Sequence, residues 1–230
     1  MNLDNIHSVY FIGIGGIGMS ALARFFKERH CTVSGYDKTE TALTKQLVAE
    51  GMHIHYTEDL TKINTKADVI VYTPAIPNNH IELQWLRENK YTIVKRSDVL
   101  QAISEYMQAI CVAGTHGKTT ISTLIAHLLR ASDVGCNAFL GGISSNYNSN
   151  YWSSANKLAV IEADEYDRSF LKLNPSIAVV SAMDADHLDI YGTVEEMERC
   201  YLQFIKQVKN TLVYKHGLTH SALFEAPSKI

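Results

Sequence analysis

Two glycine-rich turns, each between a short apolar run and an amphipathic segment, constrain this chain more than any other feature. The first, Gly13-Ile-Gly-Gly-Ile-Gly18, follows SVYFI, and the second, Gly114-Thr-His-Gly117, follows AICVA. A strand that turns through glycines into a helix is typical of a parallel α/β sheet, because the helix must carry the chain back to the next parallel strand. The chain begins this scheme twice, which predicts two α/β domains.

The rest of the chain continues the alternation of apolar runs and helical patterns. Strands are expected within residues 31–37, 52–56, 67–76, 91–96, 157–167, 176–189 and 211–217. Helices are expected within residues 18–30, 42–51 (closed by Gly51), 82–89, 97–107 (with Ser97 as N-cap), 117–132 and 193–208. The polar stretch 141–157 reads as a loop. Because the scheme restarts near residues 105–108, we expect domains over residues 1–106 and 107–230.

Composition excludes several classes of protein. The net charge of −3 gives no basic field for a nucleic-acid partner. No apolar run approaches the roughly 18 residues that a membrane-spanning helix needs, and the N-terminus lacks the pattern of a signal peptide. The four cysteines lie far apart and form no C-x-x-C pair, and buried thiols are the expected reading for Cys31 and Cys111. A cytoplasmic protein fits these features.

The second glycine turn predicts a triphosphate site. It follows a strand and opens a helix, so backbone N–H groups and the helix N-terminus would face an anion. Lys118 would reach the β- and γ-phosphates of ATP, and the Thr119 hydroxyl would bind Mg²⁺. The loop departs from the usual G-x-x-x-x-G-K-[ST] spacing, since Val112 stands where the first glycine is expected.

The first glycine turn predicts a diphosphate site without identifying the ligand. G-x-G-x-x-G followed about 20 residues later by Asp37 satisfies the dinucleotide-binding pattern. However, the loop itself requires only a pyrophosphate against a helix N-terminus. From these residues alone, NAD and a nucleotide-sugar both remain possible.

Acidic residues follow two of the predicted strands in the second domain. Glu162, Asp164 and Glu165 come after one strand, and Asp184, Asp186, His187 and Asp189 come after the next. Ligands of open parallel sheets lie beyond the carboxyl ends of the strands. A triphosphate site needs carboxylates there to hold Mg²⁺, and a histidine would suit Mg²⁺ less well than Mn²⁺ or another borderline cation.

Taken together, five motifs resemble those of the Mur ligase family, in the family's order and over nearly the whole chain. They are GIGGIGMSALA, YTPAIP, AGTHGKTT, EADEYDRSFL and DADHLDIYG. The resemblance implies a Rossmann-like parallel-sheet domain that binds a UDP-sugar, followed by a P-loop-type α/β ATPase domain. It also implies that the first loop binds the diphosphate of UDP-N-acetylmuramic acid rather than NAD.

The resemblance also implies roles for individual residues. The catalytic residues would be Lys118, Glu162 and His187, and the Mg²⁺ (or Mn²⁺) ligands would be Thr119, Glu162 and His187. The ATP loop would comprise Gly114, Thr115, His116, Gly117, Lys118, Thr119 and Thr120. The UDP-sugar site would comprise Gly15, Gly16, Ile17, Gly18, Asp37 and Thr73.

The implied reaction belongs to peptidoglycan precursor synthesis. ATP activates the muramyl carboxylate as an acyl phosphate, and the amine of L-alanine displaces the phosphate. Family members that add later amino acids carry a carbamylated lysine after the DH motif, whereas EEMERCYLQF has no lysine, which favours the L-alanine-adding type.

Two other readings stay open at this stage. Family members are about twice this length, so we expect an incomplete ATPase domain, an absent third domain and no ligase activity from this polypeptide alone. It would then be a UDP-sugar- and nucleotide-binding module. An NAD-dependent oxidoreductase would use the first loop but leave GTHGKT unexplained.

Overall fold

The computed structural model describes all residues from Met1 to Ile230, which divide into two compact units. The first unit comprises Met1–Val99 with Ser149–Tyr151, and the second comprises Leu100–Asn148 with Trp152–Ile230. This division falls inside one helix, α4 (Arg96–Tyr106), a few residues before the predicted boundary at 106/107.

The first unit is built on a five-stranded parallel sheet with the order β3-β2-β1-β4-β5. Its strands are β1 (Ser8–Ile12), β2 (Thr32–Tyr36), β3 (His53–His55), β4 (Val69–Tyr72) and β5 (Ile93–Lys95). Its helices are α1 (Ile17–Glu28), α2 (Ala42–Ala49) and α3 (Ile81–Glu88), with short 3₁₀ turns at Leu3–Asn5 and Leu60–Lys62.

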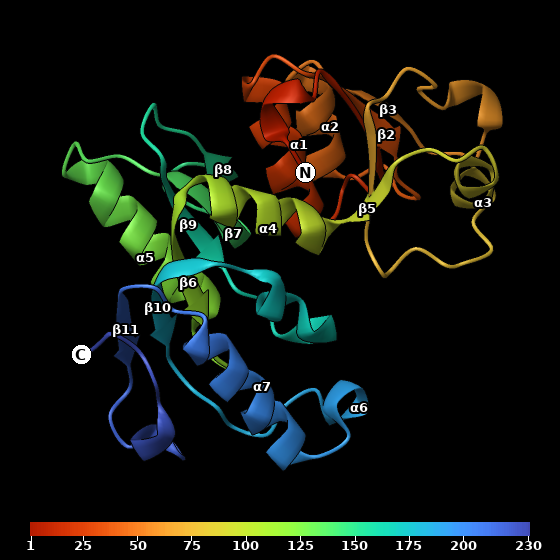
Figure 1. Ribbon diagram of the computed structural model, residues 1–230. Helices are drawn as coiled ribbons and strands as arrows, with labels where there is room; N and C mark the ends of the chain where they lie inside the picture. Colours follow the sequence, from red (N-terminus) through yellow and green to blue (C-terminus); the bar gives the residue numbers. More distant parts are fainter. The chain divides into compact units, whose positions relative to one another are not determined.

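Chain direction decides which face of this sheet each helix covers. The chain passes from β1 through α1 and α2 to β3 in one direction, and from β4 through α3 to β5 in the other. Because such crossovers are right-handed, α1 and α2 share one face while α3 takes the opposite one, as Figure 1 shows. The order reverses between β1 and β4, so the loops after these two strands lie at the switch point where such sheets bind ligands.

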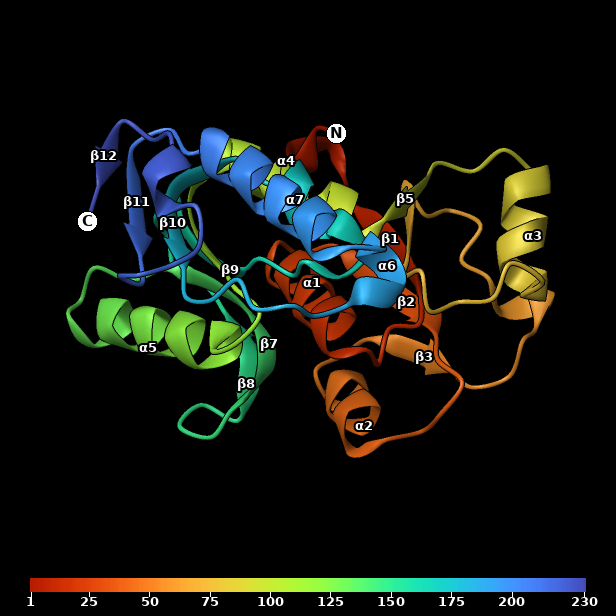
Figure 2. The ribbon, with the colours of Figure 1, turned by 90° about the horizontal axis from the view of Figure 1, so that it is seen from below.

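The second sheet has seven strands in the order β12-β11-β10-β6-β9-β7-β8, and its edge strand β8 includes the residues 149–151 that group with the first unit. Its strands are β6 (Gln108–Ala113), β7 (Asn137–Ser144), β8 (Ser149–Trp152), β9 (Leu158–Glu162), β10 (Pro175–Val180), β11 (Thr211–Tyr214) and β12 (Ser228–Lys229). The other helices of the second unit are α5 (Lys118–Ala131), α6 (Leu188–Tyr191) and α7 (Val194–Lys206), with 3₁₀ segments at Tyr166–Lys172 and Ser221–Leu223. Figure 2 shows α5 and α7 on opposite faces of this sheet.

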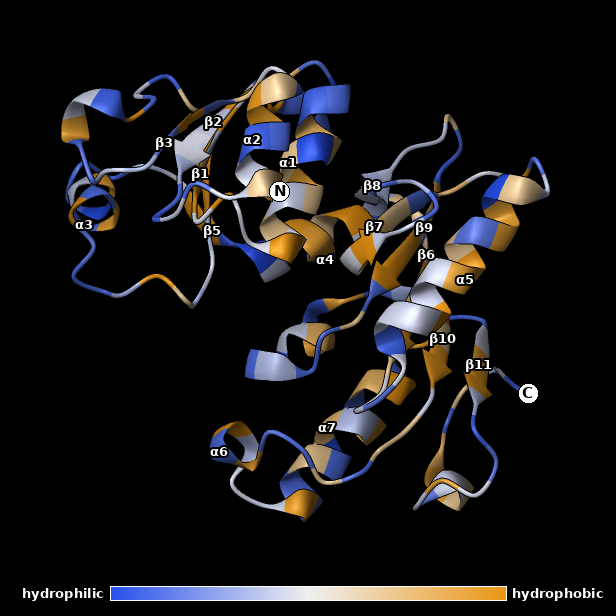
Figure 3. Ribbon diagram, turned by 180° about the vertical axis from the view of Figure 1, so that it is seen from behind, coloured by the Kyte–Doolittle hydropathy of each residue, from blue (hydrophilic) through white to orange (hydrophobic).

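Hydrophobic burial explains the central strands of both sheets. In β6, Cys111, Val112 and Ala113 are fully buried, as expected for a parallel strand covered on both faces. Figure 3 colours most of β6 and β10 as hydrophobic, whereas α5 and α7 carry both colours, since each helix covers the sheet with one face only. All four cysteines are free and buried, which confirms the reading of Cys31 and Cys111.

Two details of the sequence prediction were wrong. The stretch 141–157, read as a loop, contains the end of β7, all of β8 and only a short turn between them. Its polar residues are not all at the surface, since the Asn150 side chain is buried. Ser97 is not an N-cap, because α4 begins at Arg96 and the Asp98 carboxylate accepts a hydrogen bond from the Lys95 N–H at 2.8 Å.

The helices of both units contain no segment long and apolar enough to cross a membrane.

Candidate functional site

The turn between β6 and α5 depends on two glycines in left-handed or otherwise restricted conformations. Gly117 is the N-cap of α5 with a φ of 82°, and Gly114 has a φ of 136°. A Cβ at Gly114 would lie 2.2 Å from the Ser181 Oγ, which follows β10. The loop therefore packs closely on its neighbour and directs the N-terminus of α5 toward the carboxyl edge of the sheet, where an anion would be stabilised.

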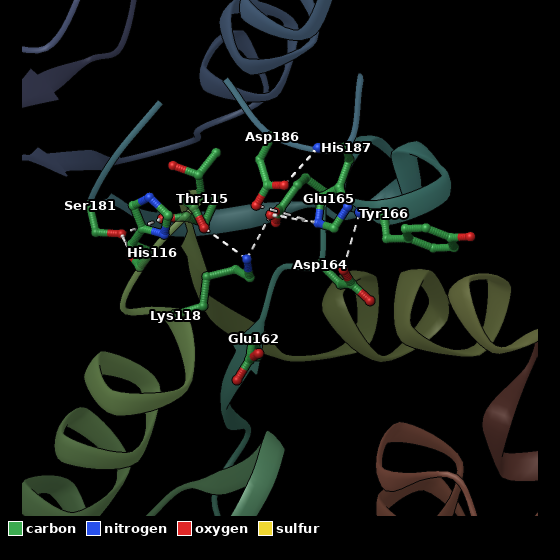
Figure 4. Close-up of polar contacts among 12 residues, drawn as sticks. Thr115, His116, Lys118, Glu162, Asp164, Glu165, Tyr166, Ser181, Asp186 and His187 are labelled. Carbon is green, nitrogen blue, oxygen red and sulfur yellow. Dashed lines mark hydrogen bonds and ion pairs between the residues drawn. The ribbon is translucent and has the colours of Figure 1, made fainter. Parts of the chain in front are cut away.

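Lys118 is the first residue of α5, and two groups hold its ammonium. The Nζ atom donates to the Gly114 carbonyl at 2.8 Å and to Glu165 Oε1 at 2.7 Å (Figure 4). The Glu165 side chain is only 1% exposed and that of Lys118 is 16% exposed, so this ion pair is largely shielded from water. A hydrogen bond between two charged groups is stronger than one between neutral groups. Exclusion of water strengthens it further, because the local dielectric is low.

Thr119 and Glu162 form a second polar group on the other side of Lys118. The Thr119 hydroxyl donates to Glu162 Oε1 at 3.0 Å, and the Gly141 N–H donates to Glu162 Oε2 at 2.9 Å. Glu162 is the last residue of β9, and Gly141 lies in the neighbouring strand β7. One hydroxyl and one oriented carboxylate are oxygen donors of the kind that Mg²⁺ prefers.

Glu165, Asp186 and His187 form a separate cluster. Their potential ligand atoms all lie within 4.8 Å of one another. His187 Nε2 lies 3.7 Å from Glu165 Oε1 and 3.8 Å from Asp186 Oδ2. Glu162, which the resemblance assigns to a different metal site from that of His187, is not part of this group. The acidic motifs could have indicated Glu165 and Asp186, but only the fold distinguishes them from their neighbours.

The other predicted residues of the loop have different environments. The Thr115 side chain is turned inward, and its Oγ1 accepts from the Asp184 N–H at 3.1 Å. His116 is exposed, with its Nε2 3.5 Å from Asp184 Oδ2. Thr120 is exposed on the first turn of α5. Thr115 thus joins the loop to the segment after β10, whereas His116 and Thr120 remain accessible.

Left-handed backbone conformations surround the acidic cluster. Asp167, Arg168 and His187 have φ values of 54°, 55° and 50°. Tyr191 fixes the same region, because its hydroxyl donates to the Glu165 carbonyl at 2.6 Å. Burial raises the pKa of Tyr191 well above its ordinary range, so the hydroxyl keeps its proton and remains a donor.

The first glycine loop follows β1, at the switch point of the five-stranded sheet. Gly16 is the N-cap of α1, and the Gly15 N–H donates to Asp37 Oδ2 at 2.7 Å. Asp37 Oδ1 accepts from the Thr39 N–H at 3.1 Å, so both carboxylate oxygens bind backbone and hold the loop. In an NAD site, by contrast, this carboxylate would bind the ribose hydroxyls.

Thr73 and Arg96 lie against the same loop. A Cβ at Gly13 would lie 3.2 Å from Thr73 Cγ2, and a Cβ at Gly18 would lie 2.1 Å from Arg96 Nη1. Ile17 and Gly18 open α1, where its N-terminus would favour an anion. The sequence prediction missed Arg96, although its place directly after a strand in KRSD was a usable signal.

Comparison with protein families gives two adjoining matches. The model for the Mur ligase family, catalytic domain, matches residues 8–107, and that for the Mur ligase middle domain matches residues 112–226.

Individual relatives agree with these matches. The chain is 51% identical over 218 residues to a UDP-N-acetylmuramate--L-alanine ligase of Cytophaga hutchinsonii, covering 91% of this chain and 47% of that protein. It is 50% identical to the enzyme of the same name from Phocaeicola vulgatus, covering 95% of this chain and 49% of the other. The chain thus spans about half the length of the curated relatives it matches.

Solved structures share the fold. A UDP-N-acetylmuramate-alanine ligase from Thermotoga maritima matches with a TM-score of 0.84 and 26% identity, covering 97% of this chain and 52% of that one. A UDP-N-acetylmuramate:L-alanyl-gamma-D-glutamyl-meso-diaminopimelate ligase from Neisseria meningitides matches with a TM-score of 0.86 and 25% identity, covering 94% and 73%.

Proposed function

The chain belongs to the Mur ligase family, and we propose that it carries the UDP-sugar and ATP sites of a cytoplasmic ligase that joins L-alanine to UDP-N-acetylmuramic acid. The observation that carries this proposal is the identity of about half of all residues to ligases of that name along more than nine tenths of the chain. The geometry around Lys118 supports it independently.

ATP would bind at the turn between β6 and α5. Its phosphates would accept hydrogen bonds from the backbone N–H groups of residues 114–119 and meet the positive end of α5. Lys118, which now donates to Glu165 and Gly114, would turn to the β- and γ-phosphates. Neutralising phosphate charge and aligning the γ-phosphate are the main contributions a protein makes to phosphoryl transfer.

The residues beside Lys118 fit a Mg²⁺ ion. Thr119 and Glu162 would hold it, since a hydroxyl and a carboxylate already face each other there at 3.0 Å. His187 would belong to a second cation site. When bound, Mg²⁺ supplies positive charge against the triphosphate.

The diphosphate of the sugar nucleotide would bind at the first loop, against Gly15, Gly16, Ile17 and Gly18, with Thr73 beside it. We add Arg96 to this site, because its guanidinium lies against Gly18, where a diphosphate would need a positive partner. Asp37 would act by holding the loop through Gly15 rather than by binding the nucleotide.

The reaction requires no protein nucleophile. A carboxylate oxygen of the muramyl group attacks the γ-phosphorus, and ADP leaves. The amine of L-alanine then attacks the carbonyl carbon of the acyl phosphate, inorganic phosphate leaves, and the amine nitrogen loses its proton. The protein would bind and orient the reactants and exclude water, which would otherwise hydrolyse the acyl phosphate.

Calorimetry on the 230-residue chain tests the binding part of this proposal. UDP-N-acetylmuramic acid and Mg²⁺–ATP should each bind one site, and NAD⁺ should not bind. Saturable NAD⁺ binding without a response to UDP-N-acetylmuramic acid would refute it. In a protein that extends to the length of the matched relatives, phosphate release should depend on L-alanine. Phosphate release that depends instead on the tripeptide L-alanyl-γ-D-glutamyl-diaminopimelate would refute the L-alanine specificity. It would assign this chain the specificity named for the Neisseria meningitides ligase.

A further inference from the structure

A pocket of about 440 Å³ lies on the first unit, and none of its lining residues belongs to either glycine loop. It is bordered by the edge strand β3, by its neighbour β2 and by the segment that begins at the 3₁₀ turn Leu60–Lys62. A volume of this size is typical of sites for small molecules. The polar residues that line the pocket are Thr32, Ser34, His53, His55, Lys62 and Asn64.

Strand register places the pocket on one face of the five-stranded sheet. Ser34 pairs with His53 across β2 and β3, so their side chains point to the same face. Tyr36, two residues after Ser34, shares that face and belongs to the same core cluster as Leu83 and Leu86 of α3. The pocket therefore lies on the α3 face at the β3 edge, whereas the first glycine loop follows β1 at the carboxyl edge of the sheet.

Ser34 carries a sign of a missing partner. The residue is only 9% exposed, and its hydroxyl is buried without a hydrogen bond to any group of the chain. A buried hydroxyl without a partner is costly, because it has lost water and gained nothing in exchange. A ligand in the pocket that Ser34 lines would supply the missing acceptor.

Three other groups of the lining are free to donate to the same ligand. The Lys62 ammonium and the His53 imidazole are exposed and form no hydrogen bond or ion pair, and the Thr32 hydroxyl is exposed and free as well. An imidazole has an N–H to donate whether it is neutral or protonated. Lys62 adds a full positive charge.

The remaining polar groups of the lining are engaged elsewhere. His55 Nε2 lies 2.8 Å from the Tyr10 hydroxyl, and His55 Nδ1 lies 2.8 Å from the Thr57 carbonyl oxygen. The Asn64 amide donates to Ser8 Oγ at 2.9 Å. The groups left for a ligand are therefore all able to donate.

No carboxylate lines the pocket to oppose the charge of Lys62. Asp59 precedes Lys62 by three residues, but its carboxylate accepts from the Thr61 N–H at 2.9 Å and from the Thr61 hydroxyl at 2.7 Å. An excess of donors together with a positive charge favours an anion.

We propose that this pocket binds a small ligand through a phosphate group, with Lys62 and His53 against its charge and the hydroxyls of Ser34 and Thr32 as further donors. A phosphate group has three strong acceptor oxygens and a charge of about −1.5 to −2 at pH 7, so it can use all four donors. A carboxylate has only two oxygens. The site is distinct from the two proposed nucleotide sites and does not depend on the proposed function.

Phenyl phosphate, inorganic phosphate and phenol test the ligand class. In nuclear magnetic resonance titrations of the isotope-labelled 230-residue chain, phenyl phosphate should cause saturable shifts of the N–H signals of residues 32–34, 53–54 and 61–64. Phenol, which has the ring without the charge, should leave these signals unchanged. Inorganic phosphate should shift the same signals, and a weaker affinity than that of phenyl phosphate would identify a phosphate ester as the better ligand. Shifts confined to residues 13–18 and 114–119 would overturn the proposal, because the phosphates would then bind only at the glycine loops.

Two variants and a matched control test the residues. Lys62→Met should lower the phenyl phosphate affinity of this site about tenfold, since a charge-assisted hydrogen bond is lost. Lys66→Met removes an exposed lysine outside the pocket and should bind as wild type does. Equal affinity in wild type and Lys62→Met, or an equal loss in Lys66→Met, would overturn the proposal.

Ser34→Ala tests the buried hydroxyl. It should lower the affinity for phenyl phosphate several-fold, yet leave the midpoint of urea unfolding unchanged or higher, because the hydroxyl makes no hydrogen bond in the free chain. A lower midpoint together with unchanged affinity would contradict the role given to Ser34, since the hydroxyl would then stabilise the fold and not the ligand.

Discussion

A methyl group added at Gly141 should disturb the ATP site through one side chain, that of Glu162. A Cβ there would lie 2.2 Å from Glu162 Oε1 and 2.6 Å from Oε2, too close for non-bonded atoms. Gly141 does not have a positive φ, so alanine adds no backbone strain. The effect of Gly141→Ala therefore comes from displacing the Glu162 carboxylate alone.

The displacement breaks two hydrogen bonds. Glu162 would lose the Thr119 hydroxyl at 3.0 Å and the Gly141 N–H at 2.9 Å. A hydrogen bond to a charged group contributes about 1.5–3 kcal/mol, but water replaces part of it at this half-exposed position. We expect the free energy of unfolding to fall by about 1–2 kcal/mol. Loss of an oriented cation ligand should lower the affinity for Mg²⁺–ATP by about 10–100-fold.

Calorimetric titration of the 230-residue chain with ATP and Mg²⁺ measures this loss, and urea unfolding measures the change in stability. Gly142→Ala is the matched control, because its Cβ would lie 3.0 Å from Thr119 Cγ2, a contact that a small shift relieves. It should lose much less affinity. Unchanged Mg²⁺–ATP affinity in Gly141→Ala, or equal losses in both variants, would refute the role assigned to Glu162.

Three other perturbations address the rest of the molecule. Lys118→Ala should weaken ATP binding at least about tenfold and leave UDP-N-acetylmuramic acid affinity unchanged, because the two loops lie in different units; equal calorimetric losses would contradict this. Gly35→Ala should lower the urea unfolding free energy by about 1–3 kcal/mol, because its Cβ would lie 2.4 Å from the Phe11 carbonyl oxygen; an unchanged midpoint would argue against that contact. Burial raises the pKa of Cys136 from 9.0 to about 11, so its contribution to stability is complete below pH 9 and declines as pH rises through 11. Urea unfolding should show a steeper decline in wild type than in Cys136→Ser, and parallel profiles would count against it.

The sequence predicted the parts of the fold that depend on local pattern. Both strand–glycine–helix units formed where the apolar runs and glycines indicated, because these residues fix the turn and the buried face by themselves. The helix ending at Gly51 is an example: Gly51 has a φ of 86° and donates its N–H to the Val48 carbonyl at 2.9 Å.

Features that depend on tertiary contacts could not be predicted from the sequence. The hairpin of β7 and β8 carries polar residues that are buried only because neighbouring segments cover them. The pairing of Lys118 with Glu165 joins residues 47 positions apart, and no spacing rule selects Glu165 over Glu162 or Asp164. The roles predicted for individual site residues accordingly remain predictions, although Thr119 and Glu162 do lie together.

The left-handed conformations of Asp167, Arg168 and His187 lower thermal stability but hold the residues of the candidate ATP site in place. Each such non-glycine residue costs about 1–3 kcal/mol, which the surrounding contacts must offset. Replacement by glycine would relieve this cost against a smaller entropy penalty of about 0.5–1 kcal/mol, so the protein should become more heat-tolerant. It would also make the backbone next to Glu165 and His187 more flexible, so these two side chains would be positioned less well. A directed-evolution experiment selecting only for thermal tolerance should therefore enrich changes at these three positions, and the variants it returns should be stable but bind Mg²⁺–ATP weakly.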